Sequence, residues 1–147
     1  MSLEDLEAAG SLLPLRTTRD ELARLMASAG RMLADAQVDG VSNQGRYVNA
    51  YHVILNCAIA ALRVQDYKID LHEGKHALAL ETLAFTLGYT PERLRVLQKM
   101  RARRNMDLYA GDRPASESER EAAVSLASKV LEDTLAYIRQ ARLDFRS

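Results

Sequence analysis

The feature that most constrains the fold is a continuous apolar run, "VILNCAIAAL" at residues 53–62. A surface helix carries one apolar stripe, but this run is apolar nearly all round a helix. Such a helix needs packing partners on every side. We therefore predict that the helix from Arg46 to about Tyr67 is the central element of a helical bundle.

The rest of the chain supplies packing partners as further helices. Thr18 and Glu21 are spaced as a capping box ahead of apolar residues at helical spacing, and "DGVSNQG" ends that helix. Residues 75–87 predict a further helix. In "GYTPER" the glycine suits the end of that helix, and the threonine and Pro91 suit the start of another. The last helix follows Ser116, which begins a second capping box.

The fold class follows from these elements. Strand alternation of useful length is missing, and short connections favour antiparallel neighbours. A chain of 147 residues with 48% hydrophobic residues has enough apolar material for one domain with a core. We therefore predict an all-α, up-and-down bundle of about five helices over residues 17–147, with residues 1–16 as a flexible N-terminal extension.

Composition limits the function and the compartment. Acidic and basic residues balance at 20 each, which argues against a general nucleic-acid coat protein, so any anion site must be local. Cys57 is the single cysteine, so it has no intramolecular disulfide partner and fits a reducing compartment. The start "MSLEDLEAAG" lacks a signal-peptide pattern, and no apolar stretch reaches membrane-spanning length. We expect a cytoplasmic protein without membrane contact.

Positive charge is concentrated before the last helix, in "RVLQKMRARRNMDLYAGD". Leu97, Arg101 and Arg104 are three or four residues apart, so they share one stripe of a helix. Arginines near a helix C-terminus also complement the helix dipole, so a purely structural role stays open. In a neutral chain, however, this concentration favours an anion site, to which Arg101, Arg103 and Lys99 would add positive charge for phosphate or RNA binding.

The segment "RRNMDLY" resembles the signature of the HEPN superfamily (higher eukaryotes and prokaryotes nucleotide-binding). That signature has an arginine and a polar residue, followed a few residues later by histidine or, in some branches, tyrosine. Arg104, Asn105 and Tyr109 match these places. The segments "LNCAIAAL", "GKHALALETLAFTLG" and "RVLQKMRARRN" also resemble the small stand-alone bacterial branch of the R-x-x-R-N-x-x-x-Y form, so the likeness covers about residues 20–140.

The resemblance implies both an assembly and a chemistry. HEPN bundles pair as two-fold homodimers, and the motifs of both copies face a shared cleft. Active members are endoribonucleases of toxin, stress or defence systems that need no metal or other cofactor, because the RNA 2′-hydroxyl attacks the adjacent phosphate. By this likeness Arg104 would neutralise the charge that develops on phosphorus, Asn105 would orient the groups, and Tyr109 would stand where proton transfer is expected.

Tyr109 departs from the commoner histidine and leaves two functions open. A phenol titrates near pH 10 and is a poor general base at neutral pH. One alternative is therefore an endoribonuclease weakened by this tyrosine. The other is a non-catalytic HEPN module that binds RNA, a nucleotide or a partner nucleotidyltransferase acting as antitoxin.

A rival motif, "HEGKH" at residues 72–76, matches the H-E-x-x-H pattern of zinc hydrolases. In that pattern His72 and His76 bind zinc and Glu73 is the general base. Gly74 interrupts the motif, and "KIDLHEG" is typical of a loop, so we rank the zinc hydrolase last and expect no bound metal. We expect His76 to begin a helix, where it either packs near the arginine motif or is an ordinary polar residue of the first turn.

Overall fold

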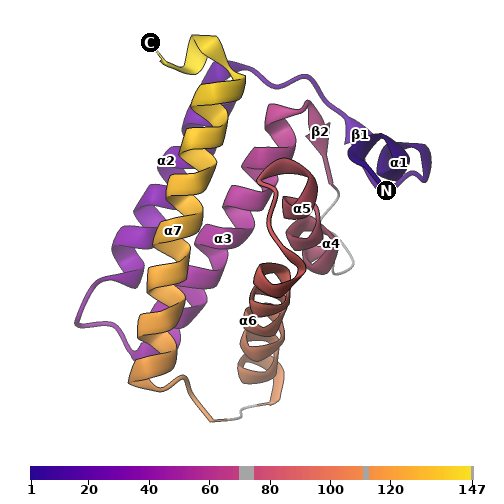
Figure 1. The fold of residues 1–147 in the computed structure, drawn as a ribbon. Coiled ribbons are helices and arrows are strands. Elements are labelled where there is room, and N and C mark those ends of the chain that lie inside the picture. Colours follow the sequence, from indigo (N-terminus) through magenta and orange to yellow (C-terminus); the bar gives the residue numbers. More distant parts are fainter. Residues whose placement is uncertain (70–74, 111–112, 147) are drawn as a thin grey trace.

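The computed structural model describes residues 1–69, 75–110 and 113–146, with the backbone alone for residues 106–110, 143 and 146. The protein is an all-α, up-and-down helical bundle, as predicted (Figure 1). Short helices lie between its long helices in the chain, and a small two-stranded sheet lies at one end. The elements are α1 (Leu3–Ala8), β1 (Leu13–Pro14), α2 (Arg19–Ala36), α3 (Asn43–Val64), β2 (Tyr67–Lys68), α4 (His76–Glu81), α5 (Leu83–Thr86), α6 (Pro91–Ala110), α7 (Glu117–Ala141) and a 3-10 turn (Leu143–Arg146).

Helix α3 is the centre of the bundle, which confirms the first prediction. It contacts α2 and α7 over most of its length, and it also contacts α4, α5, α6 and β2. Tyr51, Ile54, Cys57 and Ala61 of α3 are each 0% exposed. The apolar run is therefore matched by burial over most of the helix, with one half-buried stripe at His52, Asn56 and Ile59.

The long helices begin where their capping residues place them. The Thr18 hydroxyl accepts a hydrogen bond from the Glu21 amide at 3.2 Å. Ser116 and Glu119 form both halves of the predicted capping box, with side-chain to backbone distances of 3.1 and 3.0 Å. Helix α3 begins at Asn43, earlier than predicted, because the Ser42 hydroxyl accepts from the backbone of the first turn.

Two helix boundaries differ from the sequence prediction. Helix α3 ends at Val64 rather than near Tyr67, because Asp66 has a φ of 61° and the chain then enters β2. The helix predicted over residues 75–87 is divided at Thr82 into α4 and α5. Thr82 is fully buried, and its hydroxyl finds its acceptor locally by donating to the Ala79 carbonyl at 2.7 Å.

The N-terminal extension packs onto the bundle. Leu3, Leu6 and Leu12 form a small buried cluster with Leu62 of α3. Strand β1 pairs antiparallel with β2 at the end of α3. Residues 1–16, which the sequence analysis treated as a flexible extension, thus contribute a second, smaller apolar core.

Helix α3 is long and apolar enough to cross a membrane by length and composition alone, although the sequence analysis found no such stretch. However, 67% of its most apolar window is buried inside the bundle. Burial of this kind is typical of the core helix of a soluble protein.

Adjacent leucines test the packing of the extension. Leu12 is 1% exposed and Leu13 is 46% exposed. We predict that Leu12→Ala lowers the free energy of unfolding by roughly 2 kcal/mol, because it empties a buried site. Leu13→Ala is the matched control and should change the free energy of unfolding little. Urea unfolding followed by circular dichroism measures both, and equal small effects would show that the extension does not pack as described.

Candidate functional site

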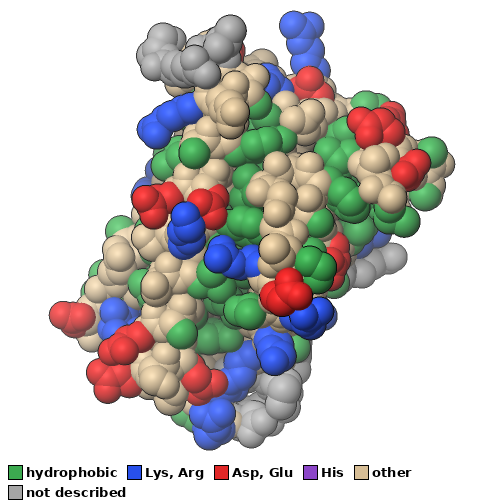
Figure 2. Space-filling model, viewed as in Figure 1, with side chains coloured by type: hydrophobic (Ala, Val, Ile, Leu, Met, Phe, Trp, Pro, Cys, Tyr) green, Lys and Arg blue, Asp and Glu red, His purple; other side chains and the backbone are tan. Residues whose placement is uncertain are grey.

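Polar side chains from α3, α4 and α6 meet beside the centre of the bundle. Helix α3 contributes Tyr51 and His52, and α4 begins with His76. Helix α6 contributes arginines, and Figure 2 shows Lys and Arg side chains gathered over this helix. We call the group the arginine–histidine cluster, and it consists of Tyr51, His52, His76, Arg101, Arg104 and Asn105.

Tyr51 lies at the centre of the cluster and contacts His52, His76 and Arg104. Its hydroxyl lies 3.3 Å from Nδ1 of His76, and its ring meets the His52 ring edge-on with 5.6 Å between centroids. The guanidinium carbon of Arg104 lies 5.9 Å from the centroid of the Tyr51 ring. Burial raises the pKa of Tyr51 to about 12, although Arg101 and Arg104 oppose this rise. Tyr51 is therefore a neutral phenol that positions the groups around it.

Both histidines of the cluster are held in the neutral form. Burial lowers the pKa of His52 below the ordinary 6.5, and the charges of Arg104 and His76 lower it further. Burial also lowers the pKa of His76, with added effects from Arg104 and Arg101. At neutral pH both imidazoles therefore keep a lone pair that can accept a proton.

These lowered pKa values also link the cluster to stability. The unfolded chain takes up protons on His52 and His76 at higher pH than the folded protein does. The free energy of unfolding is therefore not reduced by these histidines above pH 6.5. It declines as the pH falls from there through the folded-state pKa values.

The guanidinium of Arg104 is only partly hydrogen-bonded by the described residues. One of its terminal nitrogens donates to Oδ1 of Asn105 at 3.2 Å. Its Nε is buried and has no hydrogen-bond partner among the described residues. Within the same part of the chain, neither Arg104 nor Arg101 has a carboxylate partner, and Arg101 donates to Oε1 of Gln98 at 2.8 Å. A buried, unpaired guanidinium N–H is costly, and an anionic acceptor removes that cost.

The structure separates two other predicted residues from the cluster. Nε of Arg103 donates to Glu119 at 3.2 Å, and its Nη2 donates to the Arg113 carbonyl at 2.7 Å. Arg103 thereby ties α6 to the start of α7. Lys99 is exposed on α6. Among the described residues, no contact joins Lys99 to Tyr51 or the histidines.

Some predicted residues fall outside the described part of the structure. This applies to His72 and Glu73 of the rival zinc motif and to the side chain of Tyr109. His76 begins α4, as expected, and it lies beside the arginine motif rather than standing alone. Among the described residues, no three His, Cys, Asp or Glu side chains are grouped to hold a metal ion.

Sequence reasoning missed Tyr51 and His52 as members of a site. The available signal was their position, because two adjacent polar rings precede the apolar run on a helix predicted to be enclosed on all sides. Their nearness to residues of α4 and α6 depends on tertiary packing.

Comparisons of the chain with family models, with curated proteins and with solved structures find no match. The geometry of the cluster and the resemblance of its arginine motif are therefore the basis for a functional proposal.

The charges around the two histidines predict distinct responses to substitution. Arg104→Gln should raise the pKa of both His52 and His76, because Arg104 lowers both. Arg101→Gln should raise the pKa of His76 and leave that of His52 nearly unchanged. Titration of the imidazole ring protons by NMR measures these values. A wild-type pKa at or above 6.5 for both rings would contradict the described burial.

Proposed function

We propose that the protein is a metal-independent endoribonuclease of the HEPN type, with the arginine–histidine cluster as its phosphate site. The observation that carries the proposal is Arg104, whose buried Nε lacks a partner and whose charge acts on two neutral histidines. The match of Arg104 and Asn105 to the HEPN signature supports the same site.

The reaction would need no group from outside the protein and its RNA. The 2′-oxygen of RNA forms a bond to the adjacent phosphorus, and the bond from phosphorus to the 5′-oxygen breaks. The products are a 2′,3′-cyclic phosphate and a 5′-hydroxyl. One imidazole of His52 and His76 takes the proton of the 2′-hydroxyl, and the other, in its protonated form, gives a proton to the leaving 5′-oxygen.

The positive charge of the cluster would act where negative charge develops. Arg104 offers a planar guanidinium to the phosphate oxygens, and Arg101 adds to the field. A bound phosphate would also offset the effect of Arg104 on the histidines. Their pKa values would then rise, and one ring could carry the proton that the leaving group requires.

A second candidate function is a non-catalytic HEPN module. Tyr109 favours it, because a phenol stands where many relatives in that superfamily have a histidine. In this alternative Arg104 and Asn105 bind the phosphate of RNA or of a nucleotide, or the cluster meets a partner nucleotidyltransferase. In both alternatives we propose a cytoplasmic homodimer in which the two clusters face a shared cleft, within a toxin, stress or defence system.

Cleavage of unstructured RNA in the presence of EDTA tests the proposal. We predict that Arg104→Ala lowers the rate at least about 100-fold, because it removes the charge that meets the phosphate. His52→Ala and His76→Ala should each lower the rate by roughly 10²–10⁴-fold with RNA binding retained. Arg95→Ala is the matched control on α6, since Arg95 is exposed and pairs with Glu92, and it should leave the rate unchanged.

Variants of Tyr109 separate the two candidate functions in the same assay. Cleavage that is lost in Tyr109→Phe while RNA binding remains would place the phenol in the chemistry. Cleavage that rises in Tyr109→His would identify the wild type as a weakened nuclease. Wild-type protein that binds RNA without cleaving it supports the non-catalytic module. If it neither binds nor cleaves RNA, and Arg104→Ala only lowers stability, the arginines are structural.

A further inference from the structure

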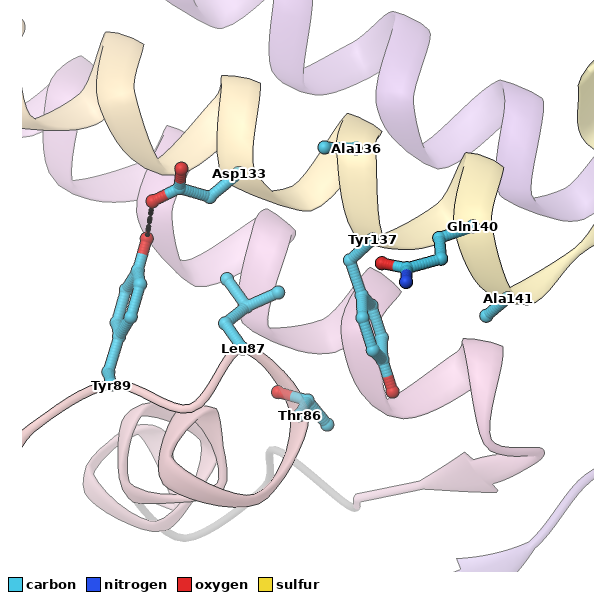
Figure 3. A pocket seen from close by; sticks show the side chains of 8 residues that line it. All are labelled: Thr86, Leu87, Tyr89, Asp133, Ala136, Tyr137, Gln140 and Ala141. Carbon is cyan, nitrogen blue, oxygen red and sulfur yellow. Dashed lines mark hydrogen bonds between the residues drawn. The ribbon is translucent and has the colours of Figure 1, made fainter.

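A cavity of about 600 Å³ lies apart from the arginine–histidine cluster, between the end of α5 and helix α7 (Figure 3). This volume is within the range of small-molecule sites. Its apolar surface comes from Leu87, Ala136 and Ala141, and its aromatic surface comes from two tyrosines. In Figure 3, Tyr89 lies at one end of the cavity, and Tyr137 lies toward the opposite end beside Gln140, with Leu87 between the two tyrosines. We call it the tyrosine cavity.

Tyr89 is held rigidly at one end. Gly88, with a φ of +71°, turns the chain after α5, and the Tyr89 hydroxyl donates to Oδ2 of Asp133 at 2.6 Å. The guanidinium of Arg93 lies over the Tyr89 ring, 5.0 Å from its centroid. Nζ of Lys129 pairs with the other oxygen of Asp133 at 3.0 Å. The carboxylate is therefore already satisfied and is not a free site for a cationic ligand.

The opposite end has polar atoms that can form hydrogen bonds with the edge of a flat ring. The Tyr137 hydroxyl accepts a hydrogen bond from Nε2 of Gln65 at 2.7 Å, which fixes the second ring. The Gln140 side chain is directed toward Tyr137 in Figure 3. Within the described part of the chain, the Gln140 amide makes no hydrogen bond, so both its donor and its acceptor are open to a ligand. Such an amide matches the edge of a nucleobase.

Positive charge lies at the Tyr89 end of the cavity. A second, smaller hollow of about 170 Å³ shares Tyr89 and Asp133 with the tyrosine cavity and is also lined by Arg93 and Lys129. Two cations there face one carboxylate. Among the described residues Arg93 has no carboxylate partner. The excess charge at this end therefore favours an anionic group on the ligand.

We propose that the tyrosine cavity and its cationic hollow bind a mononucleotide. The base lies over Leu87 at the Tyr137 end, where Gln140 meets its edge. The phosphate lies at the Tyr89 end, where Arg93 and Lys129 meet its oxygens. The ligand order follows from the cavity, which is apolar and amide-bearing at one end and cationic at the other. This site is distinct from the arginine–histidine cluster and does not depend on RNA cleavage there.

Calorimetric titration of the full chain with AMP and with adenosine tests the site. We expect AMP to bind about tenfold more tightly than adenosine, because the phosphate adds a charge-assisted contact. Arg93→Gln should remove that tenfold difference and leave the affinity for adenosine unchanged. Gln140→Ala should weaken both ligands alike, and Gln140 is exposed, so this change leaves the core intact.

Arg104→Ala is the control that separates this site from the cluster, and AMP binding should survive it. The proposal is overturned if AMP, GMP and UMP all fail to bind at millimolar concentration. It is also overturned if AMP binding is lost in Arg104→Ala and kept in Arg93→Gln, because the nucleotide then occupies the cluster. Equal AMP affinity in Arg93→Gln and wild type contradicts the phosphate position.

Discussion

The enclosure of α3 is the constraint on which the rest of the structure depends. Packing against α2, α7 and the helices α4 to α6 removes most of this helix from water, and its apolar run makes that burial favourable. Tyr51 and His52 are carried into the same environment, where an unpaired polar group is costly. Their neighbours come from the start of α4 and from α6, as His76 and Arg104. The candidate site is thus a consequence of how the core is closed.

Under the proposal, the cluster is less stable than it would be if fully paired, and in return it can bind an anion. Burial and the charge of Arg104 keep both histidines neutral, and the buried Nε of Arg104 has no partner among the described residues. In the proposed site, a bound negative group would reduce each of these costs. Functional sites are commonly less stable than the scaffold that carries them. Arg103 shows the contrast, because its pairing with Glu119 joins two helices and leaves its charge compensated.

The fold was largely predictable because its signals are local. Thr18, Ser116 and the apolar run of α3 each act through neighbours in sequence, and the helices they predicted are present. The division at Thr82 and the pairing of β1 with β2 depend on burial and on distant contacts. The same limit applies to the site. The contact between Asn105 and Arg104 was predictable because the two residues are neighbours in sequence. Arg103 and Arg104 point about 100° apart on the helix, and only the packing of the bundle determines that Arg103 meets Glu119 while Arg104 meets the cluster.

The most direct test of the account is the ionisation of His52 and His76 in the presence of a phosphodiester that cannot react. A 2′-fluoro RNA dinucleotide lacks the attacking hydroxyl, and NMR follows both imidazole rings as the pH changes. The account predicts that the bound dinucleotide raises the pKa of both histidines, and that Arg104→Gln abolishes this rise. Unchanged pKa values at saturating dinucleotide, or a rise that persists in Arg104→Gln, would contradict a phosphate site at Arg104.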